Sequence, residues 1–202
     1  MNQHFYINLK DRPERKMETV TELRKLGIKK PNRFEAITHE IPLVGCARSH
    51  IGCLEEAKKR GWDYVIIFED DIKIENKKKI NEKIKKYINY NYDVLFLGCW
   101  NYEKPVQVEP DLARVLRACC LHAYIVKSHY YDTFINNLKE GVKLKLINNL
   151  NENNNDEYMQ RLQKKDKWFC ITPIHITQKD GWSDNFGEIR NYSEVIKYIP
   201  PL

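Results

Sequence analysis

The chain has 202 residues, of which 42% are hydrophobic and 11% aromatic, and it contains only eight glycines and eight prolines. This composition excludes collagen-like, low-complexity and mainly disordered proteins and indicates a globular protein with a substantial core. The net charge of +6 comes mostly from one segment, 73–86, which has seven lysines and two glutamates. Nucleic-acid binding is not expected, because it requires basic residues interleaved with stacking aromatic ones.

No part of the sequence is typical of a membrane span or a secretory signal. The longest apolar stretches, 64–68 and 94–100, are far shorter than the roughly 20 residues that cross a bilayer. We therefore expect a cytoplasmic protein. The segment Lys73 to Lys86 is either a solvated helix face or a site of peripheral contact with an anionic membrane. The six cysteines include no Cys-x-x-Cys pair, so we expect reduced thiols used in packing.

Strands and helices alternate along the first half of the chain. Strands are expected at 4–9, 33–37, 63–68 and 93–98, and helices from Pro13 to Gly27, from Gly45 to Arg60 and within 73–88. The apolar runs at 63–68 and 93–98 are typical of parallel strands covered on both faces. This alternation predicts one α/β domain over residues 1–202, with a mixed, mostly parallel sheet flanked by helices.

The second half of the chain is less regular. Strands are expected at 113–117, 120–126 and 167–172, and helices at 128–138 and 156–164. The asparagine-rich stretch 148–155 is expected to be a loop. The remainder from 179 is expected to be mostly loop, with a short helix around 193–197.

Three acidic residues, Glu69, Asp70 and Asp71, follow the expected strand 63–68 directly. Ligands of open α/β sheets bind at the carboxyl ends of the strands, and adjacent carboxylates there are costly without a cation or a hydrogen-bond donor. If the backbone stays extended, Glu69 and Asp71 project to one side and Asp70 to the other. Two carboxylates on one side suit Mg²⁺ or Mn²⁺ on a diphosphate. The alternative is a solvated acidic turn paired with Lys73.

Several segments, in chain order, resemble glycosyltransferase family 25, which contains lipooligosaccharide β-galactosyltransferases and procollagen galactosyltransferases. They are FYINLKDRPERK, GCARSHIGCLEEAKKRGWDYVIIFEDDIKI, DVLFLG, HAYIVKSHYYDTFI, and NNDEYMQRL with PIHITQKDGWSDN. The resemblance implies a GT-A-like, Rossmann-type fold and a UDP-galactose or UDP-glucose donor. It further implies inverting transfer to a hydroxyl of a glycan, lipid-linked saccharide or hydroxylysine.

The resemblance also implies roles for particular residues. Asp71 is expected to bind Mn²⁺ (or Mg²⁺), with Glu69 on the ion or the ribose and Asp70 beside them. The donor site would further include residues after the first strand, a Ser-His pair and the closing motif: Asp11, Arg12, Arg15, Ser49, His50, Gln178, Ser183 and Asp184. Independently of the resemblance, the segment from Ala36 to His39 follows the second expected strand and is a second candidate edge of the nucleotide pocket. Without the resemblance, Asp11 is a helix cap beside exposed arginines, and the Ser-His pair is structural. A serine nucleophile is not expected, because no GxSxG elbow is present.

An inverting transfer needs a base for the acceptor hydroxyl. Asp156 and Glu157 open an expected helix and align with an aspartate of the family, and we favour Asp156. The alternative is a helix cap that complements the macrodipole. His175 matches nothing in the family, yet its ring could supply a further metal ligand; otherwise it is a half-buried strand residue.

Two other functions remain open at this point. One is a noncatalytic nucleotide- or carbohydrate-binding module with a degenerate site. The other is a different α/β enzyme that handles phosphorylated substrates. A phosphoaspartyl enzyme would show a DxDx[TV] pattern, whereas this chain has DDIK at 70–73.

Overall fold

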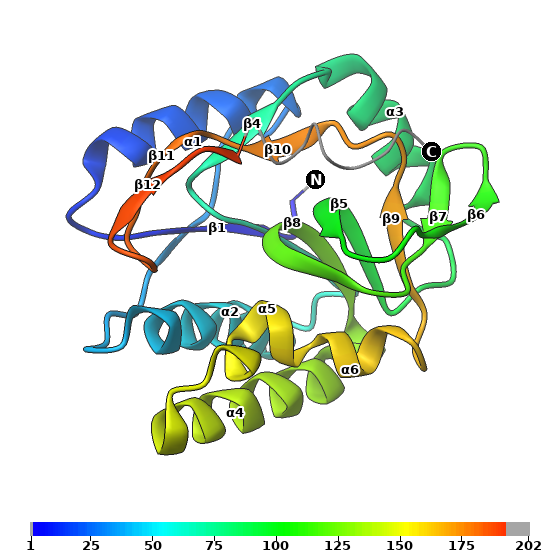
Figure 1. The fold of residues 1–202 in the computed structure, drawn as a ribbon. Helices are drawn as coiled ribbons and strands as arrows, with labels where there is room; N and C mark the ends of the chain where they lie inside the picture. Colours follow the sequence, from blue (N-terminus) through cyan, green and yellow to red (C-terminus); the bar gives the residue numbers. More distant parts are fainter. Residues whose placement is uncertain (1, 193–202) are drawn as a thin grey trace.

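The structure, a computed structural model, describes residues 2–192 and places one large sheet between two layers of helices (Figure 1). The short helix expected at 193–197 lies outside these residues. Within them, the order of the eight strands in the large sheet is β2-β1-β3-β8-β5-β9-β7-β6. The bounds are β1 (His4–Asn8), β2 (Arg33–Glu35), β3 (Tyr64–Phe68), β5 (Val94–Asn101), β6 (Val106–Glu109), β7 (Leu112–Arg114), β8 (Ala118–Lys127) and β9 (Trp168–Ile171).

Two small sheets complete the β structure of the described residues. Strand β4 (Ile72–Ile74) pairs antiparallel with β10 (Ile176–Gln178), and β11 (Gly181–Ser183) pairs antiparallel with β12 (Glu188–Arg190). The helices are α1 (Pro13–Lys25), α2 (Pro42–Lys59), α3 (Lys77–Tyr87), α4 (Tyr131–Asn148), α5 (Asn155–Tyr158) and α6 (Gln160–Gln163), with single 3-10 turns at Ser128–Tyr130 and Asn151–Asn153.

The expected mixed α/β sheet flanked by helices is confirmed. Strands β2, β1 and β3 pair in parallel, as do β5 and β9, whereas β8 is antiparallel to both β3 and β5. Six of the eight strands therefore run in one direction, and β8 and β7 run in the other. The carboxyl ends of β1, β2 and β3 consequently meet at the edge where β8 begins.

Each face of the sheet has its own core. Leu54 of α2 and Phe134 of α4 pack with Trp168 of the sheet on one face. Leu23 of α1 and Ile80 of α3 pack with Ile66 on the other. Burial of each such side chain stabilises the fold by about 1.5–3 kcal/mol, so these two layers hold the strand ends in a fixed relation.

Several elements differ from the sequence predictions. The lysine-rich segment starts as strand β4, and its helix begins only at Lys77, where the side chain of Asn76 accepts a hydrogen bond from the Lys79 N–H. Helix α4 runs beyond the predicted end to Asn148, and Asn149 ends it in the left-handed conformation. The helix predicted at 156–164 is two short helices, α5 and α6. Strands β6, β10, β11 and β12 were not predicted.

The lysines of 73–86 do not form one uniform face. Lys83 is buried, donates to the carbonyl of Thr172 and lies 3.1 Å from the Asp111 carboxylate. Lys73 pairs with Glu75. Contact of the other lysines with an anionic membrane stays a prediction. No helix within residues 2–192 has both the length and the apolar character needed to cross a bilayer.

Candidate active site

A cavity of about 510 Å³ opens where the carboxyl ends of β1, β2 and β3 meet. It is bounded by the start of α1, the loop after β2, helix α2, the acidic turn after β3 and the β11–β12 hairpin. The residues that the sequence placed at the donor or metal site and that line this cavity are Arg12, Arg15, Ala36, Ser49, His50, Glu69, Asp70, Asp71, Gln178, Ser183 and Asp184.

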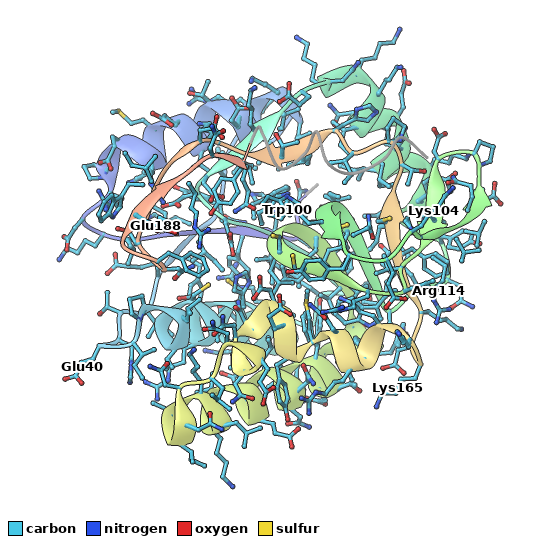
Figure 2. The ribbon with its side chains drawn as sticks, in the orientation of Figure 1. Glu40, Trp100, Lys104, Arg114, Lys165 and Glu188 are labelled. Atoms are coloured by element: carbon cyan, nitrogen blue, oxygen red, sulfur yellow. The ribbon has the colours of Figure 1, made fainter. Side chains whose placement is uncertain are left out.

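A second cavity of about 390 Å³ adjoins the first. Its wall includes both candidate bases, Asp156 and Glu157, together with Trp100 at the end of β5, which Figure 2 labels near the middle of the molecule. Residues common to both walls are Cys46, Glu69, Gln178, Asn185 and Tyr192. These shared residues separate the two cavities, so a molecule in either one lies beside the same wall.

Asp71 is the most conspicuous polar group in the first cavity. Gln178 Nε2 donates to its Oδ2 over 3.0 Å, and the backbone N–H of Lys179 donates to its carbonyl. Its Oδ1 is buried and has no hydrogen-bond partner among residues 2–192, and the same is true of Gln178 Oε1. A buried carboxylate oxygen without a partner is costly. Binding of a cation, or of a ligand that donates a hydrogen bond to Asp71, would remove this cost.

The condition of extended backbone beyond Glu69, under which Glu69 and Asp71 would project to one side, is not met at the next two residues. Glu69 still continues the β3–β8 ladder, since its N–H donates to the carbonyl of His122. Asp70 and Asp71 then form a turn, because β4 must reverse away from the large sheet to pair with β10. All three carboxylates nevertheless face the first cavity. Lys73 pairs with Glu75 instead, so the solvated acidic turn is not what the structure contains.

The three carboxyl groups have different pKa shifts. Burial, followed by the charges of Glu69 and Asp70, raises the pKa of Asp71 to about 7. Burial also raises the pKa of Asp70. Burial acts to raise the pKa of Glu69 as well, but His50 and further positive groups outweigh it, and the net shift is downward. Glu69 is therefore the member of the triplet whose pKa lies below its ordinary value, and a cation bound at Asp71 would favour loss of the Asp71 proton.

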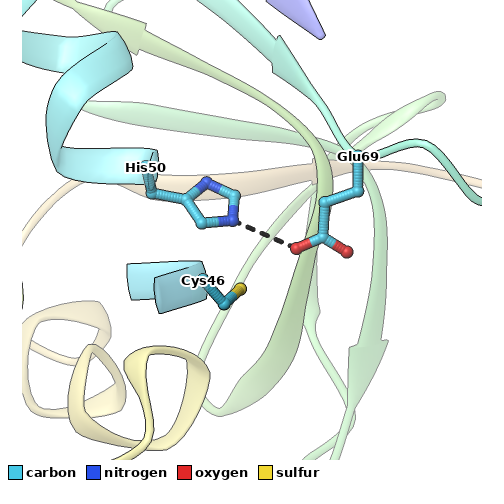
Figure 3. Close-up of side chains that lie close together, drawn as sticks. All are labelled: Cys46, His50 and Glu69. Atoms are coloured by element: carbon cyan, nitrogen blue, oxygen red, sulfur yellow. Dashed lines mark hydrogen bonds and ion pairs between the residues drawn. The ribbon is translucent and has the colours of Figure 1, made fainter. Parts of the chain in front are cut away.

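His50 holds Glu69 in place from the buried face of α2 (Figure 3). Its Nε2 lies 3.1 Å from Glu69 Oε1 and its Nδ1 lies 2.9 Å from the Tyr124 hydroxyl. Because an ionised carboxylate only accepts hydrogen bonds, Nε2 carries the proton that faces Glu69. His50 is fully buried, and its contact with Glu69 positions that carboxylate at the wall of the first cavity.

Asp70 faces the side of the cavity formed by β1 and α1. Asn8 Nδ2 donates to its Oδ2 over 2.7 Å, Arg15 donates to its Oδ1, and Thr19 donates to its backbone carbonyl. Asn8 was not among the predicted site residues. It is the last residue of β1, so the rule that favours polar residues at strand ends could have identified it.

Two arginines of the start of α1 reach across the cavity to the hairpin. Arg12 donates to both carboxylate oxygens of Asp184, and Arg15 lies 3.7 Å from the same carboxylate. Arg15 also donates to the backbone carbonyl of Trp182. The hydrogen bond to Asp184 raises the pKa of Arg12 further above its ordinary value. These contacts connect the amino-terminal and carboxy-terminal sides of the cavity.

Ser49 supports the loop after β2 through two hydrogen bonds. Its hydroxyl donates to the carbonyl of Gly45 and accepts from the N–H of Ile37, each over 2.8 Å. Ile37 and Ala36 line the first cavity. Close approach of this loop to α2 depends on Gly45, since a Cβ there would lie 2.5 Å from the Ile37 carbonyl oxygen.

We expect Gly45→Ala to displace this loop and to destabilise the protein by about 1–3 kcal/mol, the usual cost of overpacking. The free energy of unfolding from urea titration would measure the change. Gly61→Ala is the contrasting variant: its added Cβ has open space around it, and only its φ of +63° opposes the substitution. If Gly45→Ala kept full stability and unchanged ligand affinity, the role assigned to this contact would be wrong.

The two candidate bases are not equivalent. Glu157 accepts from the Tyr102 hydroxyl and from Gln160, so both of its carboxylate oxygens are engaged. Asp156 receives backbone N–H donors, and burial, followed by the charges of Glu157 and Glu69, raises its pKa to about 6. A carboxylate that titrates near neutrality is suited to general base catalysis.

Two predicted residues lie elsewhere. Asp11 is exposed, lines neither cavity and provides no side-chain cap for α1. His175 is buried and also lines neither cavity. Its pKa is lowered by burial and by the nearby charges of Lys83 and Lys79, so its surroundings are those of the α3 side and do not suit a cation. The motif that contains His175, at 173–184, reaches the cavities only after β10 begins, since Gln178 at the end of that strand lines both of them.

Tyr192 is a site residue that sequence reasoning missed. It lines both cavities and stacks edge-on against Trp100, with ring centroids 5.6 Å apart. Burial, followed by the charges of Asp71 and Glu69, raises its pKa to about 12, so its hydroxyl stays protonated. No sequence pattern marks this tyrosine, because its neighbours come from distant segments.

The raised pKa of Asp71 predicts a pH-dependent stability. The pKa of the Asp71 carboxyl is about 7 in the folded protein and 3.8 ordinarily, so Asp71 binds its proton more tightly in the folded state than in the unfolded state. The protonated Asp71 therefore makes its full favourable contribution to the free energy of unfolding below about pH 4, and that contribution is lost as the pH rises through 7. Between pH 5.5 and pH 8, the loss of this proton alone lowers the free energy of unfolding by about 2 kcal/mol.

We accordingly expect Asp71→Asn, in chelator, to be more stable than the wild type at pH 8 and to lose that advantage at pH 5.5. Urea unfolding at both pH values measures this difference, and comparison with the wild type cancels the titration of other groups. A variant that is equally stable or less stable than the wild type at pH 8 would contradict the buried environment assigned to Asp71.

Comparison with known proteins bears on the fold and the family. A family model described as glycosyltransferase family 25 (LPS biosynthesis protein) matches residues 41–144, which include α2, the acidic triplet and most of the sheet. No sequence among curated proteins matches the chain.

Two crystal structures share its fold at low sequence identity. The protein A197 from STIV has a TM-score of 0.51 and 11% identity, with coverage of 94% of this chain and 93% of that one. A glycosyltransferase involved in the glycosylation of the major capsid of PBCV-1 has a TM-score of 0.51 and 11% identity, with coverage of 83% and 80%.

Proposed function

The chain belongs to glycosyltransferase family 25, and from that premise we propose that it is a metal-dependent, inverting hexosyltransferase. The proposed donor is UDP-galactose or UDP-glucose, and the proposed acceptor is a hydroxyl of a glycan, a lipid-linked saccharide or hydroxylysine. The metal-dependent part is supported by the buried Oδ1 of Asp71 in the turn after β3, which has no hydrogen-bond partner within the described part of the chain.

The residues around Asp71 fit a divalent cation. Asp71 Oδ1 and Gln178 Oε1 are both buried and accept no hydrogen bond from any residue that the structure describes, and Glu69 adds a second carboxylate to the same cavity. Oxygen ligands of this kind suit Mn²⁺ or Mg²⁺. When bound, such an ion would neutralise charge on the departing diphosphate. We do not include His175 in this ligand set, because it lies outside both cavities.

We assign the nucleotide to the first cavity. Arg12 and Arg15 line it beside the acidic triplet, and guanidinium groups bind phosphate oxygens in pairs. In the structure these arginines form ion pairs with Asp184 and Asp70. A diphosphate there would compete with Asp184 for Arg12, so we expect nucleotide binding to loosen the contact between α1 and the hairpin.

We assign the acceptor to the second cavity, where Asp156 serves as the base. The acceptor hydroxyl oxygen attacks C1 of the hexose, the bond between C1 and the diphosphate oxygen breaks, and UDP leaves with the electron pair. Asp156 takes the proton of the hydroxyl. Glu157 is less suited, since Tyr102 and Gln160 already donate to it. Attack from the face opposite the diphosphate inverts the configuration at C1.

The test is release of UDP from a panel of UDP-sugars, with Mn²⁺ and with chelator. We expect release from UDP-galactose or UDP-glucose that requires the ion and increases when a suitable acceptor is present. Equal release in chelator would contradict metal dependence. If the protein instead cleaved a nucleotide-sugar with a different base or sugar, the proposed donor would be wrong, whereas the family assignment would stand.

A further inference from the structure

Two adjacent cysteines at the start of β8 line the second cavity together. The Sγ atoms of Cys119 and Cys120 are 3.7 Å apart. Successive residues of a strand normally place their side chains on opposite faces. The two thiols lie together here because the backbone of Cys120 has a φ of +72°.

That backbone conformation is unusual for a residue with a Cβ. A left-handed residue other than glycine costs about 1–2 kcal/mol, and glycine would adopt the same φ without that cost. Strained residues of this kind concentrate at functional sites. The strain at Cys120 therefore points to a use for the paired thiols that packing alone does not require.

A third group completes a possible ligand set. A carboxylate oxygen of Asp156 and the two sulfur atoms all lie within 4.8 Å of one another. In a tetrahedral zinc site with Zn–S bonds of about 2.3 Å, two sulfurs are separated by about 3.8 Å. The observed separation of 3.7 Å thus already matches such a site.

The charges around these groups also favour a cation. The carboxyl groups of Asp156 and Glu69 line the same cavity as the two cysteines. Arg190, which also lines this cavity, pairs with Glu188 of the hairpin. A bound cation would relieve the repulsion among the thiolates and carboxylates, with release of the thiol protons to solvent.

We propose that Cys119, Cys120 and Asp156 bind a thiophilic divalent cation such as Zn²⁺, at a site separate from the oxygen ligands around Asp71. Two thiolates and one carboxylate leave a fourth position for water. A cation there also occupies the carboxylate that would accept the acceptor's proton, so Zn²⁺ inhibits transfer. This inhibitory part rests on the proposed function, whereas the binding part does not.

Cadmium tests the binding part, because its bond to thiolate gives an ultraviolet charge-transfer band that requires no enzyme activity. We expect the reduced wild-type protein to show a saturable band with one equivalent of Cd²⁺. Cys120→Gly, which suits the local φ, and Cys119→Ala should each lose at least tenfold in affinity, since loss of even an outer-shell partner costs about 10–100-fold. Cys53→Ala is the matched control, because Cys53 is buried in α2 within the core.

Alkylation mapped by mass spectrometry gives a second readout on the wild type alone: Cd²⁺ should protect Cys120 from iodoacetamide. Wild-type affinity in Cys120→Gly, or no protection of Cys120, would overturn the proposal. Loss of the band in Cys99→Ala but not in Cys120→Gly would also overturn it.

Asp71→Asn separates this proposal from the proposed function. It should retain the cadmium band and lose stimulation by Mn²⁺. If Cd²⁺ binds but Zn²⁺ does not inhibit UDP release, Asp156 is not the base. If no Cd²⁺ binds while Mn²⁺-dependent release persists, only the thiolate site is wrong.

Discussion

Asp71→Asn is expected to lower the turnover number for UDP release by about 10³-fold. Several kcal/mol of leaving-group stabilisation is typical of a catalytic divalent cation, and about 4 kcal/mol corresponds to this factor. The carboxamide keeps the shape of Asp71 and its contact with Gln178 but removes the charge that would hold the ion. The measurement is steady-state UDP release at saturating donor with Mn²⁺.

Asp132→Asn is the matched control. Asp132 is an exposed carboxylate of α4 that pairs with Lys58, and we expect wild-type turnover from it. Turnover within threefold of wild type in Asp71→Asn would refute the assignment of this residue as a metal ligand. Because the same substitution should stabilise the protein at pH 8, a loss of activity through unfolding is readily recognised.

Asp156→Asn is expected to lower the turnover number for transfer by about 10²–10⁴-fold, the range for a well-placed general base. The wild-type rate should rise with pH through about 6 as Asp156 loses its proton. An amide cannot accept that proton, so the same limb of the pH profile should disappear in the variant. The donor's affinity should stay unchanged, which separates a chemical role from a binding role.

Glu157→Gln is the neighbouring control. Glu157 accepts hydrogen bonds from Tyr102 and Gln160, so we expect a loss of less than tenfold and a pH profile like that of the wild type. The reverse result, with a small loss in Asp156→Asn and a large one in Glu157→Gln, would exchange their roles.

The acidic triplet was predictable because its position depends on local sequence alone. A continuous apolar run must be a strand covered on both faces, and the residues after it must lie at the sheet edge. The family resemblance added Arg12, Arg15 and Gln178, and the structure brings these into the same cavity as the triplet. The general α/β architecture followed in the same way from the alternation of strands and helices.

Other features depend on pairings between distant segments, which a single sequence does not reveal. The turn at Asp70 and Asp71 exists because β4 pairs with β10, about one hundred residues later in the chain. The contact of Arg12 with Asp184 likewise joins the two ends of the described chain. The left-handed backbone conformation of Cys120 could not be predicted from the sequence, because glycine or asparagine usually occupies positions with that conformation.

The affinity of UDP, measured by calorimetry with Mn²⁺ and with chelator, tests most directly whether Asp71 helps to hold an ion that the nucleotide shares. We predict that Mn²⁺ tightens UDP binding at least tenfold in the wild type and has no such effect in Asp71→Asn. Equal UDP affinity with and without the ion in the wild type, or equal stimulation in the variant, would contradict the account.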